Sequence, residues 1–218
     1  MTEFYLFQRT IISSKEHERR LAMDRLMRGL QGSRAVFLDR DGVIIEDVHY
    51  LRQASQLRII PGAAAAIRRL RHAGLKVIVV SNQSAIARGL ISRSGVDAVH
   101  RLLNRRLRQR GARIDAIYYC PHHPGFGRKR ACACRKPAIG MLKAAARRFK
   151  LDIARCYLVG DTTTDIRAAR NAGCAALLVK TGKGGRDRAF RIRPDRAFRD
   201  LSQASRWIVS REKKPIKA

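Results

Sequence analysis

The stretch AVFLDRDG at positions 35–42 places two carboxylates directly after a short apolar run. Four consecutive apolar residues without alternating polar ones predict a strand that is buried on both faces. Asp39 and Asp41 would leave the end of that strand, where carboxylates are costly unless a cation or hydrogen bonds stabilise them. We therefore expect an ion-binding or catalytic site there. The alternative, acids that cap a following helix, is disfavoured because VIIEDVHYL (43–51) has an extended pattern.

Outside this stretch, apolar runs alternate with helical patterns along the chain. Pro61 opens a helix that ends at Gly74, and apolar residues recur at helical spacing from about Ser94 to Arg110. Further strands are expected at 75–80, 113–120, 156–160 and 174–180, and further helices at 139–149 and 164–172. This alternation predicts a doubly wound α/β fold, a parallel sheet covered on both faces. In such a sheet, ligands bind at the carboxyl ends of the strands.

The composition is that of a globular protein with one domain of ordinary size, since 45% of the 218 residues are hydrophobic and 29% are charged. We divide the chain into a basic N-terminal extension (1–33), a core (34–182) and a basic C-terminal tail (183–218) that packs on the core or extends from it. No apolar run approaches the ~20 residues that span a bilayer, and the N-terminus lacks the apolar segment of a secretory signal. We expect a cytoplasmic monomer without a membrane partner.

The net charge of +30 is extreme and has two interpretations. A nucleic-acid-binding protein carries such a charge, and so does a protein whose cationic surface attracts small anionic substrates. The Arg and Lys residues are scattered through helices and tails, without an RNA-binding aromatic motif or a zinc-finger repeat. We therefore favour the second interpretation and expect no specific nucleic-acid partner.

Polar side chains also follow the other predicted strands. Ser81, Asn82 and Gln83 follow the second strand, Arg135 and Lys136 lie beyond the third, and the fourth is followed by the acidic pair Asp161 and Asp165. Each group alone is ordinary loop chemistry. In chain order, each beyond a strand, they predict one composite site at the carboxyl edge of the sheet.

Six segments carry a resemblance to a known family: FLDRDGVI, EDVHYL, SNQSAIARG, IYYCPHHP, CACRKPAIGML and VGDTTTDIRAARNAG. They resemble, over residues 34–182, the four motifs of the haloacid dehalogenase superfamily of phosphatases, and are most similar to its histidinol-phosphatase-like branch. The resemblance implies a haloacid dehalogenase-like core with no large cap, a Mg²⁺-dependent reaction and a small-molecule sugar phosphate substrate. The substrate it implies is D-glycero-D-manno-heptose 1,7-bisphosphate, hydrolysed at the 7-phosphate. The alternatives are histidinol phosphate as substrate, or a catalytically silent basic scaffold that binds nucleic acid.

Phosphoester hydrolysis needs a nucleophile, charge neutralisation on the phosphoryl oxygens and a proton for the leaving alkoxide. The resemblance implies that Asp39 forms an aspartyl-phosphate, while Asp41 protonates the leaving oxygen and later activates water. Mg²⁺ would bind the Asp39 carboxylate, the Asp41 backbone carbonyl and Asp161. The expected substrate contacts are Ser81, Asn82, Gln83, Ser84 and Lys136 for the transferring phosphoryl group, Arg135 for a second anionic group, and Asp47 and Tyr50 for the sugar.

A cluster of cysteine and histidine residues predicts a second metal site. Cys120 and His122 form a C-x-H pair, followed after nine residues by the C-x-C pair Cys132 and Cys134. Four such ligands fit a closed, structural Zn²⁺ site; the alternative is unrelated buried cysteines beside surface histidines. We interpret the remaining two cysteines, at 156 and 174, as core thiols, and TGKGG (181–185) as a loop without a nucleotide-binding role.

Overall fold

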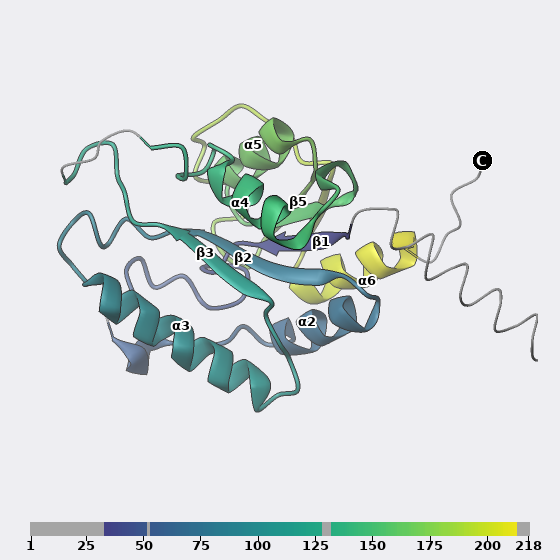
Figure 1. Cartoon of the computed structure of the whole chain (residues 1–218), viewed down its shortest axis with the longest axis horizontal. Helices are drawn as coiled ribbons and strands as arrows, with labels where there is room; N and C mark the ends of the chain where they lie inside the picture. Colours follow the sequence, from purple (N-terminus) through teal and green to yellow (C-terminus); the bar gives the residue numbers. More distant parts are fainter. Residues whose placement is uncertain (1–32, 52, 128–131, 213–218) are drawn as a thin grey trace, which may run out of the picture. The chain divides into compact units, whose positions relative to one another are not determined.

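Six parallel strands form the sheet at the centre of the protein, in the order β3-β2-β1-β4-β5-β6 (Figure 1). The computed structural model describes residues 33–51, 53–127 and 132–212, so positions 1–32 of the predicted N-terminal extension lie outside the described residues. The strands are β1 (Ala35–Leu38), β2 (Lys76–Asn82), β3 (Ala116–Cys120), β4 (Tyr157–Gly160), β5 (Ala175–Val179) and β6 (Arg196–Phe198). The helices are α2 (Ala63–His72), α3 (Arg93–Arg108), α4 (Gly140–Phe149), α5 (Thr163–Ala172) and α6 (Leu201–Glu212), with short 3-10 turns η1 (Ala54–Gln56) and η2 (Ile153–Arg155).

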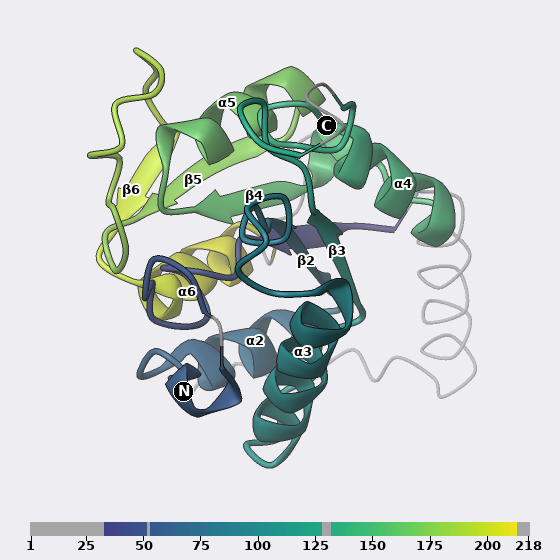
Figure 2. The ribbon, with the colours of Figure 1, turned by 90° about the vertical axis from the view of Figure 1, so that its left-hand side faces the viewer.

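The apolar run of β1 has no polar residue because helices cover both faces of the sheet. Ala35 and Phe37 pack into a core with α4 and α5. Val36 and Leu38 point to the other face and pack with α2, α3 and α6. Figure 2 shows these two helical layers on opposite sides of the sheet. The structure thus confirms the predicted doubly wound α/β fold.

The predicted helices and strands agree with the structure to within a few residues, and the largest difference is at β3. The sequence pattern predicts a strand from residue 113, whereas β3 begins at Ala116. The preceding Asp115 uses its carboxylate to accept a hydrogen bond from the Val77 N–H at 2.8 Å and to pair with Arg71 at 2.5 Å. These contacts hold Asp115 outside the strand, so β3 begins at the next residue.

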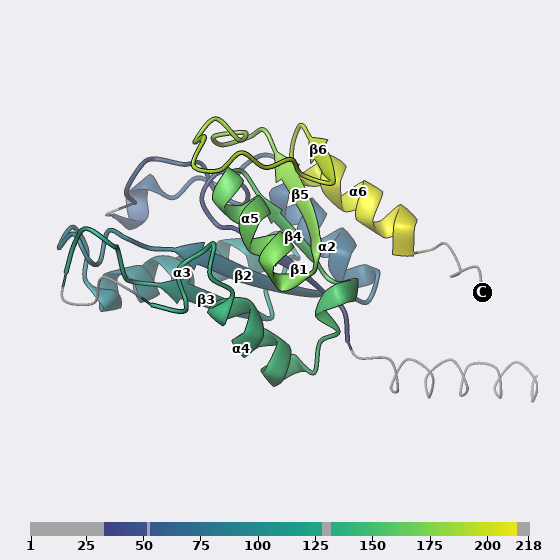
Figure 3. The same cartoon turned by 90° about the horizontal axis from the view of Figure 1, so that it is seen from above.

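The segment after residue 182 contributes a strand and a helix that the sequence analysis did not assign. β6 pairs with β5 at the edge of the sheet, and α6 lies along α2 (Figure 3). The helix buries Leu201, Ala204 and Ile208 in the core shared with α2. Among the described residues, no helix is both long and apolar enough to cross a membrane.

Candidate active site

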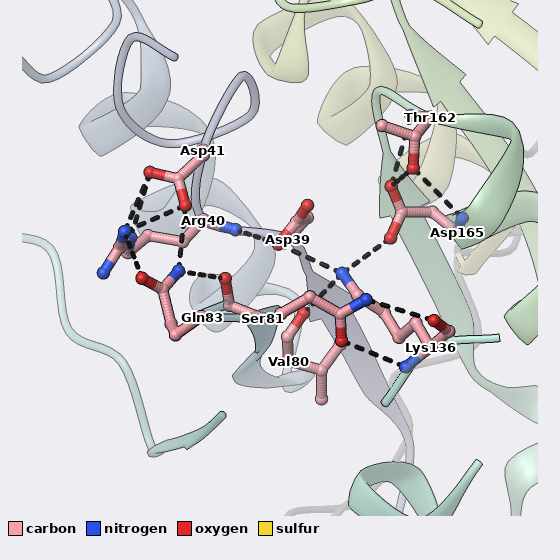
Figure 4. A network of polar contacts seen from close by, with 10 residues as sticks. Asp39, Arg40, Asp41, Val80, Ser81, Gln83, Lys136, Thr162 and Asp165 are labelled. Carbon is pink, nitrogen blue, oxygen red and sulfur yellow. Dashed lines mark hydrogen bonds and ion pairs between the residues drawn. The ribbon is translucent and has the colours of Figure 1, made fainter. Parts of the chain in front are cut away.

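A buried lysine and two carboxylates meet at the carboxyl edge of the sheet (Figure 4). The Lys136 Nζ lies 3.1 Å from Asp39 Oδ1 and 2.6 Å from Asp165 Oδ1, and it donates a hydrogen bond to the Val80 carbonyl at 2.8 Å. Burial alone would lower the pKa of Lys136, but Asp165 and Asp39 raise it above its usual range. Lys136 is therefore a fixed positive charge beside the predicted nucleophile.

Asn82 at the end of β2 holds the backbone of Lys136 in place. Its Oδ1 accepts a hydrogen bond from the Lys136 N–H at 3.0 Å, and its Nδ2 donates to the Lys136 carbonyl at 3.1 Å. The side-chain amide of Asn82 is thus engaged with the protein itself. These two hydrogen bonds hold Lys136 at the end of β2, although it lies 54 positions after Asn82 in the sequence.

Three carboxylates form a cluster that fits a hard divalent cation. Oxygen atoms of Asp39, Asp161 and Asp165 all lie within 4.8 Å of one another. Burial, reinforced by Asp165 and Asp41 and opposed by Lys136, raises the pKa of Asp39 to about 6. Burial together with Asp39 and Asp165 raises the pKa of Asp161 to about 7. Carboxylate oxygens are the ligands that Mg²⁺ prefers. A bound cation would also offset the repulsion between these closely spaced carboxylates, which contributes to their raised pKa values.

Asp165 differs from the other two carboxylates because both of its oxygens already have partners. Its Oδ1 pairs with Lys136, and its Oδ2 accepts from the Thr162 hydroxyl at 2.5 Å and the Thr162 N–H at 3.2 Å. This Thr162–Asp165 capping box starts α5. Asp39 and Asp161, the side chains that the sequence analysis assigns to Mg²⁺, therefore have the freest oxygens for a cation, and Asp165 contacts Lys136.

The loop at 181–185, which the sequence analysis interprets as a loop without a nucleotide-binding role, contacts this site. The Lys183 N–H donates to Asp161 Oδ2 at 2.7 Å. Gly42 has φ +75°, and a Cβ there would lie 2.5 Å from Asp161 Oδ2 and 3.0 Å from the Gly182 Cα. Both glycines are needed because two backbone segments approach one carboxylate. The Gly content of TGKGG was the sequence signal for this close approach.

Asp41 is held from behind by Arg40 and Gln83. The Arg40 Nη2 lies 2.9 Å from Asp41 Oδ2 and 3.0 Å from Asp41 Oδ1, and the Gln83 Nε2 donates to Asp41 Oδ2 at 3.0 Å. Gln83 also accepts from Arg40 at 2.9 Å and donates to the Ser81 hydroxyl at 2.8 Å. Gln83, predicted as a substrate contact, is buried behind Asp41 by these contacts.

Apart from Gln83, the predicted catalytic, Mg²⁺-binding and substrate-binding residues line one cavity of about 580 Å³, a size that suits a small ligand. The predicted residues that line it are Asp39, Asp41, Asp47, Tyr50, Ser81, Asn82, Ser84, Arg135, Lys136 and Asp161. It is also lined by residues that the sequence analysis did not select, among them Arg88, His123, Lys183, Asp187 and Phe190. Arg88 and His123 lie within the quoted segments SNQSAIARG and IYYCPHHP but were given no role there, and it is the fold that brings these residues to the site.

The lining includes a cationic group away from the carboxylates. The Arg88 guanidinium lies over the Phe126 ring, 4.0 Å from its centroid, and 3.2 Å from His123 Nε2. Arg135 donates from Nη1 to the His122 carbonyl at 3.0 Å. Burial and the positive charges of Arg135 and Arg88 lower the pKa of His123. Two guanidinium groups near an imidazole give this part of the cavity positive charge and hydrogen-bond donors of the kind that suit an anion.

The predicted zinc ligands come together at the end of β3. The Cys120 Sγ lies 3.6 Å from Cys132 Sγ and 3.3 Å from Cys134 Sγ, and the His122 Nδ1 lies 3.3 Å from Cys134 Sγ. Zn–S bonds of about 2.3 Å in a tetrahedron separate sulfur atoms by about 3.7 Å, so this cluster fits Zn²⁺ closely. His123 points elsewhere, towards Arg88 and Phe126.

Known proteins resemble this chain in sequence and in fold. A family model described as haloacid dehalogenase-like hydrolase matches residues 36–97, and one described as HAD-hydrolase-like matches residues 133–204. Together with the relatives that follow, these matches show that the chain belongs to the haloacid dehalogenase-like hydrolases. It is 41% identical to the D-glycero-beta-D-manno-heptose-1,7-bisphosphate 7-phosphatase of Bordetella bronchiseptica over 80% of this chain and 97% of that protein. It is 44% identical to the D-glycero-D-manno-heptose-1,7-bisphosphate 7-phosphatase of Thermosynechococcus vestitus over 81% of this chain and 95% of that protein.

A solved structure agrees with these sequence relatives. The crystal structure of the D,D-heptose 1,7-bisphosphate phosphatase from B. bronchiseptica, complexed with magnesium and phosphate, matches this structure with a TM-score of 0.74. The two chains are 36% identical, over 82% of this chain and 99% of the other. The family resemblance and the fold class predicted from the sequence are both confirmed.

Proposed function

We propose that this chain is a Mg²⁺-dependent phosphatase that hydrolyses D-glycero-D-manno-heptose 1,7-bisphosphate at the 7-phosphate. The observation that supports the reaction is the meeting of Asp39, Asp41, Lys136 and Asp161 around one cavity. The substrate is supported by the names of the two relatives, which the chain matches over nearly their whole length. A silent scaffold would have no reason to keep a lysine buried between carboxylates, since that burial is costly.

The first chemical step would transfer the phosphoryl group to the protein. An Asp39 oxygen attacks phosphorus, and the bond from phosphorus to the sugar oxygen breaks while protonated Asp41 donates its proton to that oxygen. Lys136, 3.1 Å from Asp39, offsets negative charge on the phosphoryl oxygens. Mg²⁺ held by Asp39, Asp161 and the Asp41 carbonyl would supply further charge neutralisation.

The second step would regenerate the enzyme. Asp41, now a carboxylate, removes a proton from water, and the resulting nucleophile attacks the phosphorus of the aspartyl-phosphate. The bond between Asp39 and phosphorus breaks, which releases inorganic phosphate. Asp41 thus returns to its protonated form, ready for the next substrate.

The rest of the cavity would recognise the substrate. Ser81, Asn82 and Ser84, which line the cavity, would hold the transferring phosphoryl group, because hydroxyls and backbone N–H groups can donate to its oxygens. Asp47 and Tyr50 would face the sugar hydroxyls. Arg135, joined by Arg88, would bind the phosphate that is not hydrolysed, because a guanidinium can donate two parallel hydrogen bonds to a phosphate.

A phosphate-release assay on the purified, zinc-containing protein with Mg²⁺ tests this function. We expect the heptose 1,7-bisphosphate to give the highest kcat/KM, with a product that keeps its 1-phosphate. Arg135→Ala and Arg88→Ala should each raise KM for the bisphosphate by about tenfold or more and change KM for a small monophosphate little. A higher kcat/KM for histidinol phosphate would instead support that substrate.

We also propose that the enzyme is a cytoplasmic monomer. None of the five cysteines forms a disulfide, which suits a reducing compartment. A sugar bisphosphate does not cross a bilayer unaided, so its hydrolysis belongs where it is made. Size-exclusion chromatography with light scattering should give a mass close to 24.6 kDa.

A further inference from the structure

Arg40 is an unusual residue for an active-site loop because it is almost completely buried. Only 2% of its surface is exposed, although it lies between the predicted nucleophile and the predicted acid. Its Nε and Nη2 contact Asp41, at distances from 2.9 to 3.2 Å, while its Nη1 lies 3.1 Å from His100 Nε2. The guanidinium therefore bridges Asp41 and helix α3.

His100 is in turn fixed within its own surroundings. It is 6% exposed, and its ring packs against the Tyr119 ring with centroids 5.3 Å apart. The Tyr119 hydroxyl donates to Asp97 at 3.0 Å. A guanidinium has no acceptor, so the Nε2 of a neutral His100 must accept from Arg40, which places the ring proton on Nδ1. Burial and the charge of Arg40 lower the pKa of His100 to about 4, in agreement with this neutral form.

We propose that Arg40 and His100 are positioning residues that hold the Asp41 carboxyl group in the orientation for proton transfer. The Asp41 side chain is 27% exposed towards the cavity, and its hydrogen bonds to Arg40 and Gln83 fix its orientation. An acid must come within about 2.6–3.2 Å of the leaving oxygen to protonate it. Arg40 contacts both Asp41 oxygens, and the contact of His100 Nε2 with Arg40 Nη1 holds the guanidinium in that position. This inference rests on the proposed function, in which Asp41 is the general acid.

The role of a general acid has a distinctive chemical signature. The leaving group of a sugar phosphate is the sugar alkoxide, a strong base that needs a proton as its bond to phosphorus breaks. The leaving group of nitrophenyl phosphate is nitrophenolate, a stable anion that does not need a proton. A misplaced Asp41 should therefore lower kcat/KM for the sugar phosphate much more than for the aryl phosphate. A change that only loosens the fold or the phosphate site would lower both values alike.

Two substitutions at His100 make the test. His100→Leu keeps the bulk of the ring but removes the acceptor, and we expect kcat/KM to fall about 10²-fold for the sugar phosphate but less than about fivefold for nitrophenyl phosphate. His100→Gln restores an acceptor and should recover most of the loss. His72→Leu is the matched control, because His72 lies exposed on α2, and it should change neither value.

Arg40→Lys repeats the test without altering α3. An ammonium group cannot contact both Asp41 oxygens and His100 together, so the same selective loss is expected, at least as large as for His100→Leu. Melting temperature and zinc content identify variants that fail to fold. Equal losses on the two substrates, or no loss on either, would overturn the inference. A wild-type protein that hydrolyses neither substrate would instead contradict the proposed function.

Discussion

Asp39 has a surrounding structure that allows its charge to be removed without loss of the fold. In Asp39→Asn, Lys136 keeps its ion pair with Asp165 at 2.6 Å and its hydrogen bond to the Val80 carbonyl. The amide cannot attack phosphorus, so we expect turnover to fall by a factor on the order of 10⁴ or more. Phosphate release and melting temperature measure the two effects. Asp152→Asn is the control, since Asn caps η2 as well as Asp does. An Asp39→Asn variant that keeps a tenth of wild-type activity would refute the assignment.

The carboxylate cluster makes stability depend on pH in the Mg²⁺-free protein. Folding raises the pKa of Asp161 to about 7 and that of Asp39 to about 6, from 3.8. A raised pKa means that the folded state binds more protons, so this contribution to stability is complete below about pH 4 and is lost as pH rises to 7. Mg²⁺ replaces those protons.

We therefore expect Mg²⁺ to raise the melting temperature more at pH 8 than at pH 5.5. Thermal unfolding of the zinc-loaded protein, with and without Mg²⁺, measures this difference. Asp161→Asn removes one of the two shifted groups and should reduce the difference markedly. The same gain from Mg²⁺ at both pH values would contradict the electrostatic account of the cluster.

At this scale, sequence reasoning found the charged residues of the site but not all of their partners. Asp39, Asp41 and Asp161 were predictable because each follows an apolar strand, where a carboxylate is costly unless a cation or hydrogen bonds stabilise it. Arg88 and His100 were not selected: Arg88 lies in the quoted segment SNQSAIARG but was given no role, and a lone His on a helix is ordinary. Their significance depends on contacts over 35 and 60 positions of sequence, which only the fold reveals.

The loop from β3 to α4 joins the zinc cluster to the active site. Cys120 ends β3 at one side of the loop, and Cys134 directly precedes Arg135 and Lys136 at the other. Phe126, 43% exposed, contributes little buried apolar surface. Metal ligation can supply about 10 kcal/mol in small zinc peptides, which would replace the missing core.

Loss of the zinc should therefore loosen the substrate site without dismantling the sheet. We expect about one zinc per chain by elemental analysis. Cys132→Ser or Cys134→Ser should lose that zinc and raise KM, while slow Asp39-dependent turnover persists.

Cys156→Ser and Cys174→Ser are the controls for this prediction and should keep the zinc. Both thiols are buried in the core beside α5, and burial raises the pKa of each, to about 11 and about 12. A never-chelated protein without zinc, or one that needs Cys156 to hold it, would overturn this account of the loop.

Among the strands and α-helices of the described residues, the sequence did not predict β6 and α6, for different reasons. β6 has only three residues, two of them exposed, so it carries no apolar pattern. α6 does carry one, since Leu201, Ala204 and Ile208 recur at helical spacing and are buried. The polar and basic residues between these apolar positions in α6 made the apolar spacing hard to recognise in the sequence. A short edge strand is thus beyond sequence reasoning, whereas α6 was within it.

For the whole molecule, the net charge of +30 is the property that the fold does not explain. Basic side chains occur in the last turn of every described α-helix, so the charge is spread over the surface and follows no single element. Positive charge spread in this way raises the local concentration of any anion. Salt screens the attraction beyond about 10 Å at 0.1 M ionic strength. It favours fast encounter with a charged substrate over recognition of a sequence.

We accordingly expect kcat/KM to fall modestly as NaCl rises from about 20 to 300 mM, with kcat nearly constant, because screening slows encounter and leaves the buried Lys136 unaffected. The fall should be steeper for a bisphosphate than for a monophosphate, since the bisphosphate carries more charge. Stopped-time assays at fixed pH measure both dependences.

Binding to duplex DNA and to RNA, measured by fluorescence anisotropy, should be weak at physiological salt, steeply salt-dependent and independent of sequence. Tight binding that selects one sequence at 0.15 M salt would contradict this account and give the charge a partner of its own.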